Sequence, residues 1–218
     1  MNSPILQLLV LAGIAVFLIL RLKNVLGTRD GFENPQSPQP IERPSRKPDL
    51  SVIEGGPDRD IIDHVPEGSD AALALSQMKS LEPNFSVSEF LQGARGAYEM
   101  ILMGFERGEM AEIKPFLSDD VYETFAQVVE AREQQGLTIE AEFLGVRETS
   151  LADADFVDGR IAEITVRFVG ELTSAVRDNA GEIIEGDPKT PKKQRDVWTF
   201  AREMASDDPN WQLVATGG

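Results

Sequence analysis

The chain has 218 residues, 41% of them hydrophobic, which is enough for one ordinary domain with additional segments. It contains no cysteine, so disulfides, thiolate nucleophiles and thiolate metal sites are excluded. The formal net charge of −16 argues against nucleic acid as a partner, because phosphate binding needs clustered Lys and Arg. The charge is uneven: residues 1–50 carry six basic and four acidic side chains, and the remaining residues carry 15 and 33.

An apolar run near the amino terminus, residues 5–20, contains no charge and a single polar side chain, Gln7. As a helix it would extend roughly 24 Å, and the long side chains that follow can make up the remaining distance across a bilayer. A cleavable secretory signal would carry its positive charge before the apolar run. Here the basic residues follow it, at Arg21, Lys23 and Arg29. We therefore predict a transmembrane anchor within residues 1–26 and, by the positive-inside rule, the bulk of the chain in the cytoplasm.

Residues 27–68 differ in composition and hold seven of the 13 prolines. No helical or strand period is sustained there, so we predict a disordered tether. The single histidine, His64, falls near the end of this tether. One histidine without an ordered neighbour is expected to act neither as a metal site nor as a general base.

Residues 69–218 carry the patterns of a folded domain. Its central element is a helix over residues 86–108, in which Ser86 and Glu89 have the capping-box spacing and Gly108 supplies the stop. Three more helical segments are predicted, over residues 69–81 with a cap at Ser69, over 110–114, and over 118–135 with a cap at Ser118. The first of these either packs on the domain edge or docks on lipid or a partner.

Beyond Gly136 the hydrophobic period changes from about 3.6 to 2, which predicts strands. We expect four of them, over residues 137–146, 160–176, 195–204 and 211–216, with a phase slip after Phe143 that indicates a bulge. Connections are expected at 151–159 and at 179–194, the second rich in Gly, Pro and Lys. Successive strands joined by hairpins imply an antiparallel, curved four-stranded sheet with the helices on one face, so the fold class is α+β.

No pattern typical of catalysis or cofactor binding is present. The sequence has no Gly-rich phosphate loop and no cluster of His, Cys and carboxylates at ligand spacing. We therefore predict a protein that is not an enzyme, with no catalytic residue, metal site or cofactor. One alternative stays open, since Tyr98 or Tyr122 could pair with an aspartate as acid and base in a cone-shaped pocket. Trp198 and Trp211 are expected to be cross-strand partners in the sheet core.

Several short motifs follow one another in order along the domain: Phe85, Phe90, Leu91, Gly93 and Ala94; then Tyr122 and Phe125; then Trp198, Phe200 and Arg202; and finally Trp211 and Leu213. Together with the anchor they resemble the Tim-44-like domain family, most closely its alphaproteobacterial members, over about residues 70–218. The resemblance implies an NTF-two-like, cone-shaped α+β fold with a large apolar cavity. It also implies residence at the bacterial inner (cytoplasmic) membrane.

In the mitochondrial relatives this domain tethers an import motor to a translocon and contacts preproteins and anionic lipid, so the resemblance implies a binding role. The mitochondrial domains rely on basic surface for lipid, whereas this domain is acidic. We therefore expect the transmembrane segment to provide the anchoring.

The expected function is a membrane-anchored, cytoplasm-facing adaptor that binds a protein partner, with a link to protein translocation or membrane protein handling. The alternative is a small-molecule or lipid-binding protein, or an enzyme, that uses the apolar cavity of the cone. By helical face and strand alternation, seven side chains are expected to line that cavity: Tyr98, Leu102, Phe105, Phe125, Val129, Phe168 and Trp198.

Overall fold

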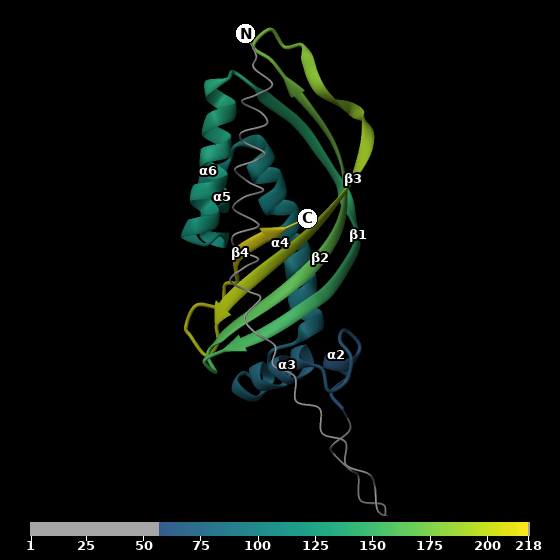
Figure 1. Ribbon diagram of the computed structural model, residues 1–218, viewed down its shortest axis with the longest axis vertical. Coiled ribbons are helices and arrows are strands. Elements are labelled where there is room, and N and C mark those ends of the chain that lie inside the picture. Colours follow the sequence, from purple (N-terminus) through teal and green to yellow (C-terminus); the bar gives the residue numbers. More distant parts are fainter. Residues whose placement is uncertain (1–56, 218) are drawn as a thin grey trace, which may run out of the picture. The chain divides into compact units, whose positions relative to one another are not determined.

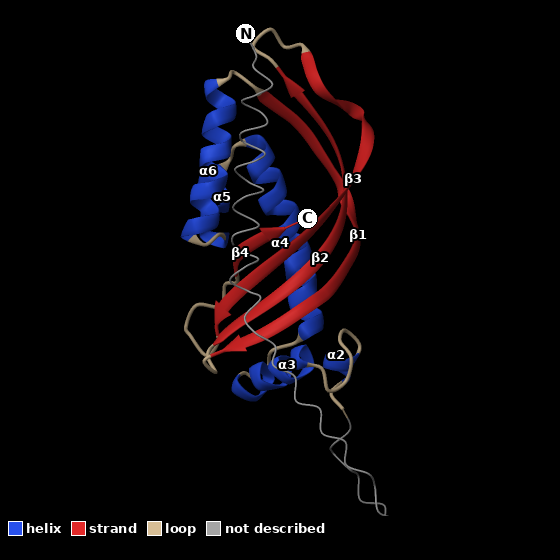
Figure 2. Ribbon diagram, viewed as in Figure 1, coloured by secondary structure: helices blue, strands red, loops and turns tan. Residues whose placement is uncertain are grey.

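An antiparallel sheet of four strands, in the order β1-β2-β3-β4, curves around a long helix in the computed structural model, which describes residues 57–217 (Figures 1 and 2). The long helix lies on the concave side of the sheet, so the predicted α+β class with a curved antiparallel sheet is confirmed.

The long helix is α4, Val87–Arg107, and it packs against β1 and β2. Its start is fixed by the Ser86 side chain, which accepts a hydrogen bond from the amide of Glu89 at 3.3 Å. It ends at Gly108, whose φ of 75° is a left-handed conformation that glycine adopts without strain. Both boundaries agree with the sequence prediction.

Two further helices also begin at their predicted caps. Ser69 caps α3, Asp70–Leu81, and Ser118 caps α6, Asp119–Gln134. Between α4 and α6 lie two short turns, α5 (Met110–Ile113) and η1 (Lys114–Phe116). Helix α3 packs against β1, and α6 contacts α5 and β4.

The strands are longer than the sequence predicts. They are β1 Thr138–Val157, β2 Ile161–Arg177, β3 Ile183–Glu203 and β4 Gln212–Gly217. The predicted connection at 151–159 was mostly wrong, because β1 stays paired with β2 as far as Val157 and the turn covers only residues 158–160. The predicted connection at 179–194 was also mostly wrong, because β3 already begins at Ile183.

Bulges interrupt the alternation of side chains, which explains why the sequence pattern did not reveal the full length of these strands. The register of β1 against β2 shifts at three places, the first of them between Phe143 and Gly145, where the sequence predicts a slip. In β3, four residues between Asp187 and Lys192 lie opposite the single residue Thr173. At Gly186, φ is 78° and an added Cβ would lie 2.2 Å from the carbonyl oxygen of Ser174, so only glycine fits.

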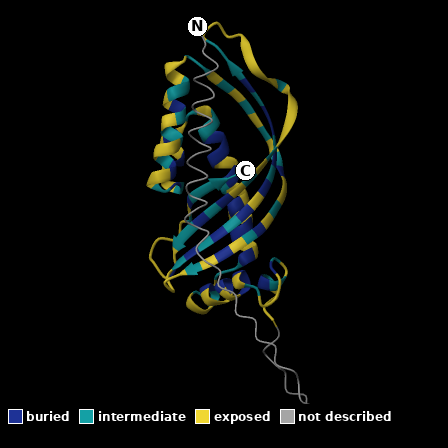
Figure 3. Ribbon diagram, in the orientation of Figure 1, coloured by how far each residue is buried: buried dark blue, intermediate teal, exposed yellow. Residues whose placement is uncertain are grey.

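The two ends of the sheet differ in how far their residues are buried (Figure 3). The lower part of β2 alternates buried and more open positions, with Ile164, Val166 and Phe168 facing the core. The first half of β3, in contrast, is exposed along nearly its whole length.

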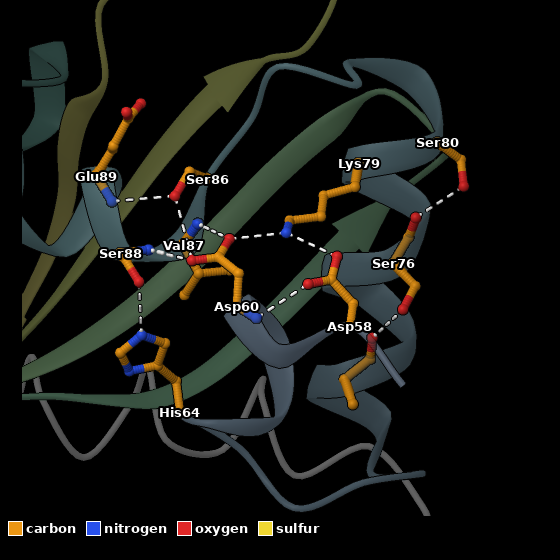
Figure 4. Close-up of polar contacts among 11 residues, drawn as sticks. Asp58, Asp60, His64, Ser76, Lys79, Ser80, Ser86, Val87, Ser88 and Glu89 are labelled. Carbon is orange, nitrogen blue, oxygen red and sulfur yellow. Dashed lines mark hydrogen bonds and ion pairs between the residues drawn. The ribbon is translucent and has the colours of Figure 1, made fainter. Parts of the chain in front are cut away.

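The last part of the predicted tether is ordered. Residues 59–62 form α2, Arg59–Ile62, and both Ile61 and Val65 belong to the hydrophobic core. His64, expected to lack an ordered neighbour, lies 3.2 Å from the hydroxyl of Ser88 (Figure 4). The predicted anchor and the rest of the tether lie outside the described residues. Within residues 57–217, none of the helices combines the length and the apolar character needed to cross a bilayer.

Candidate functional site

Three of the predicted cavity residues pack into an aromatic cluster in the core. The Tyr98 ring from α4 stacks on Phe168 of β2 with centroids 4.4 Å apart, and Trp198 of β3 lies 4.8 Å from Tyr98. All three side chains are buried. They fill the space between helix and sheet, where the sequence predicts an open apolar cavity.

The other predicted cavity residues lie between α4 and α6 or are buried beside them. Phe105 and Phe125 have ring centroids 4.6 Å apart, and the guanidinium of Arg132 lies 4.4 Å above the Phe105 ring. Leu102 and Val129 are buried in the same core. The seven residues therefore belong to, or pack against, one continuous hydrophobic core, and none of them lines the groove described below.

Tyr98 has an aspartate partner that the sequence analysis did not identify. Its hydroxyl donates a hydrogen bond to Asp196 at 2.5 Å, and the Gln194 amide donates to the same carboxylate at 3.2 Å. A glycine at position 170 leaves room for this hydroxyl, since an added Cβ there would come within 2.8 Å of it. Strand alternation could have found the partner, because Asp196 lies two residues before Trp198 and so shares its face.

The electrostatics of this pair do not favour proton transfer. Burial, reinforced by the hydrogen bond to Asp196 and by its negative charge, raises the pKa of the Tyr98 phenol far above its usual value. The phenol therefore stays protonated near neutral pH. Its ring has no exposed surface, so a substrate would have to displace the aromatic cluster to reach it.

A groove with a volume of about 430 Å³ lies between α4, α5 and β1. Its apolar lining comes from Met100, Met103, Ile113 and Phe143. Gly104 lets α5 approach α4 closely, because an added Cβ would lie 2.4 Å from Ile113 Cγ2. We refer to this feature as the α4–β1 groove.

Acidic side chains dominate the polar lining of the α4–β1 groove. Four exposed glutamates contribute to it, with Arg107 as the one basic lining residue: Glu99, Glu109, Glu112 and Glu142. Among the described residues, none of these five side chains takes part in an ion pair. The groove therefore presents net negative charge around an apolar floor. Little in the sequence indicates this groove, because its residues come from three separate elements.

Residues 57–217 contain no group of three or more His, Asp or Glu side chains arranged to hold a metal ion.

A curved antiparallel sheet over a capped central helix, with a groove at the sheet edge, defines an α+β domain with a surface suited to binding. A family model described as "Tim44-like domain" matches residues 71–218, and the chain belongs to this family. The human mitochondrial import inner membrane translocase subunit TIM44 is 25% identical over 144 residues, covering 64% of this chain and 31% of that protein. The Arabidopsis thaliana subunit TIM44-1 is 24% identical over 151 residues, covering 66% and 32%.

The chain therefore spans about a third of the length of the curated relatives that it matches. Among solved structures, the intermembrane space region of the chloroplast protein ARC6 is similar with a TM-score of 0.35 and 13% identity. That match covers 58% of this chain and 94% of the ARC6 chain.

Proposed function

We propose that this protein is a membrane-anchored, cytoplasm-facing adaptor whose Tim44-like domain binds a protein partner and catalyses no reaction. Membership of the Tim44-like family supports a link to protein translocation, because the relatives are subunits of a mitochondrial inner membrane translocase. The apolar run at residues 5–20 followed by Arg21, Lys23 and Arg29 supports the anchor and its orientation.

The observation that carries the proposal is the α4–β1 groove. Its four unpaired glutamates surround methionine side chains, which are flexible and adapt to different apolar contacts. A protein segment that carries both basic and apolar side chains would match this lining in charge and in polarity. We propose that the groove is where the partner docks.

A binding role fits the Tyr98–Asp196 pair better than catalysis does. The raised pKa of Tyr98 opposes its use as a base near neutral pH, and its complete burial leaves no space for a substrate. Packing of the predicted cavity residues against one another likewise gives no support to the alternative of a ligand held inside the cone.

Charge reversal in the groove tests the proposal. In affinity capture of the full chain from detergent-solubilised membranes, E109K/E112K should recover roughly tenfold less of a stoichiometric partner than the unaltered protein. The matched control is E123K/E133K, which makes the same charge change at exposed positions of α6, away from the groove.

The partner should be identified by mass spectrometry, and both variants should keep the thermal stability of the unaltered chain. Equal recovery with E109K/E112K and E123K/E133K would show that the groove is not the docking site. Repeated recovery of the protein alone would argue against an adaptor.

A further inference from the structure

We propose that the α4–β1 groove accepts the basic edge of a second copy of this chain, so that copies associate head to tail. The basic edge is defined by four side chains of β3: Lys189, Lys192, Lys193 and Arg195. This inference rests on the proposed use of the groove as a protein-binding site, and it names one occupant.

The basic edge stands out against the charge of the whole chain. A protein with a net charge of −16 places four of its 21 basic side chains within the seven residues 189–195. All four are exposed. Within the described residues none of them forms an ion pair, just as none of the groove glutamates does. Two surfaces of opposite sign, whose named side chains form no ion pair in the described residues, therefore occur on one molecule.

Their positions in the sheet prevent a copy from joining its own two surfaces. The groove takes Glu142 and Phe143 from β1, whereas the basic edge belongs to β3, and β2 lies between these strands. Strand β4 pairs with β3 only over residues 197–201, which leaves the basic edge at the border of the sheet. The two surfaces therefore lie at opposite edges, an arrangement that permits a heterologous contact between copies.

The local structure of β3 favours contact through side chains over addition of a strand. Residues 188–191 have no partners in β2, and two of them are prolines, Pro188 and Pro191. Proline and lysine at a sheet edge disfavour pairing with another strand. The lysine ammonium groups can instead approach the glutamates while their apolar stems lie along Met100 and Met103.

Site-directed cross-linking tests this contact, and the absence of cysteine makes the full chain a clean background. One full-length chain carries Met100→Cys in the groove, and a second carries Thr190→Cys in the basic edge. Oxidation of the mixture should give a disulfide-linked dimer. The matched control pairs Thr190→Cys with Ser80→Cys, an exposed position on α3, and should give none. Equal dimer yields in the two mixtures would overturn the proposal.

Charge reversal then separates a specific contact from chance collision. Adding E109K/E112K to the Met100→Cys chain, or K192E/K193E to the Thr190→Cys chain, should abolish the cross-link. If the cross-link persists in both, the proposed charge pairing is wrong.

A mixing experiment checks the head-to-tail geometry. Without cysteines, the neutralised variant E109Q/E112Q keeps only its basic edge and K192Q/K193Q keeps only its groove, so each should be monomeric alone. Glutamine is used here because a basic groove and an acidic edge would attract each other. Mixed, the two variants should form one junction and stop at a dimer in native mass spectrometry. Failure to form this dimer would contradict the head-to-tail contact.

The outcomes also distinguish this inference from the proposed function. If no cross-link forms but E109K/E112K still loses its captured partner, the groove binds another protein and self-association is wrong. If the partner is retained as well, both proposals fail.

Discussion

Asp60 connects the start of the ordered region to the central helix (Figure 4). Its carboxylate accepts hydrogen bonds from the amides of Val87 at 2.7 Å and Ser88 at 3.0 Å, and it pairs with Lys79 at 2.7 Å. These amides belong to the first turn of α4, where the helix dipole favours a negative charge. A side chain from the predicted tether thus caps the element around which the domain is built.

The pKa of Asp60 follows from these contacts. Partial burial opposes its ionisation, but the hydrogen bonds from Lys79, Ser88 and Val87 outweigh burial and hold the pKa well below its usual range. Because the folded-state pKa lies below the unfolded one, the carboxylate stabilises the fold above the unfolded pKa. That contribution is lost as the pH falls below about 4.

Asp60→Asn should therefore lower the free energy of unfolding by about 2 kcal/mol near pH 7, because charged hydrogen bonds to the helix amides and to Lys79 are lost. The difference from the unaltered protein should shrink below about pH 4, as measured by urea unfolding across a pH series. Asp63→Asn is the control, since Asp63 is exposed and its side chain makes no hydrogen bond or ion pair in the described residues. An effect of Asp60→Asn that does not depend on pH would contradict the charge argument.

At the scale of the elements, the helices and the strands differed in how well the sequence described them. Helix boundaries depend on local chemistry, and Ser69, Ser86 and Ser118 all act as the predicted caps. Strand boundaries depend on pairing with distant residues, so bulges and an exposed strand such as the first half of β3 obscured them. Trp198 and Trp211 illustrate the same limit, because Trp198 pairs with Thr216 while Trp211 packs on Phe90.

A mutation that weakens the packing of α6 is expected to destabilise that helix without destabilising the sheet. The contact of α6 with α4 includes the Phe105–Phe125 pair, whereas Phe168 belongs to the aromatic cluster on the sheet. Phe125→Ala should lower the free energy of unfolding by about 2 kcal/mol. This is less than the loss expected for a fully buried phenylalanine, because Phe125 is only partly buried. Amide hydrogen exchange should rise in residues 119–134 and stay unchanged in β1 and β2.

Phe168→Ala provides the contrast. It removes a side chain that is 1% exposed, so exchange should rise through the sheet and α4 together. If Phe125→Ala gives the same uniform pattern of exchange, α6 and the sheet unfold as a single unit. The Phe105–Phe125 pair would then not be independent of the aromatic cluster on the sheet.

At the scale of the whole molecule, the ordered region begins earlier than the sequence predicts. Residues 57–68, assigned to the tether, contribute Ile61 and Val65 to the core and Asp60 to the cap of α4. An ordered segment contributes net favourable free energy, since otherwise it would detach. The domain therefore includes this segment as part of its fold.

A fragment of residues 69–218 should accordingly be less stable than one of residues 57–218, by about 2 kcal/mol. Recovered chain entropy offsets part of the lost burial, which keeps the expected difference modest. Urea unfolding of the two fragments measures it. If the two fragments have equal urea midpoints and equal dependence of the unfolding free energy on urea concentration, residues 57–68 do not stabilise the domain.

Local signals in the sequence were enough to predict the fold class, the limits of α3, α4 and α6, and the resemblance to the Tim44-like family, because hydrophobic period, caps and short motifs are all local. The sequence also determined that Tyr98, Phe168 and Trp198 face the interior, through helical and strand alternation. The three-dimensional fold was needed to see that these side chains fill the interior, that Tyr98 donates a hydrogen bond to Asp196, and that four glutamates line one groove. Those contacts join residues far apart in the chain, and their distances depend on how bulged strands curve around α4, which no local pattern specifies.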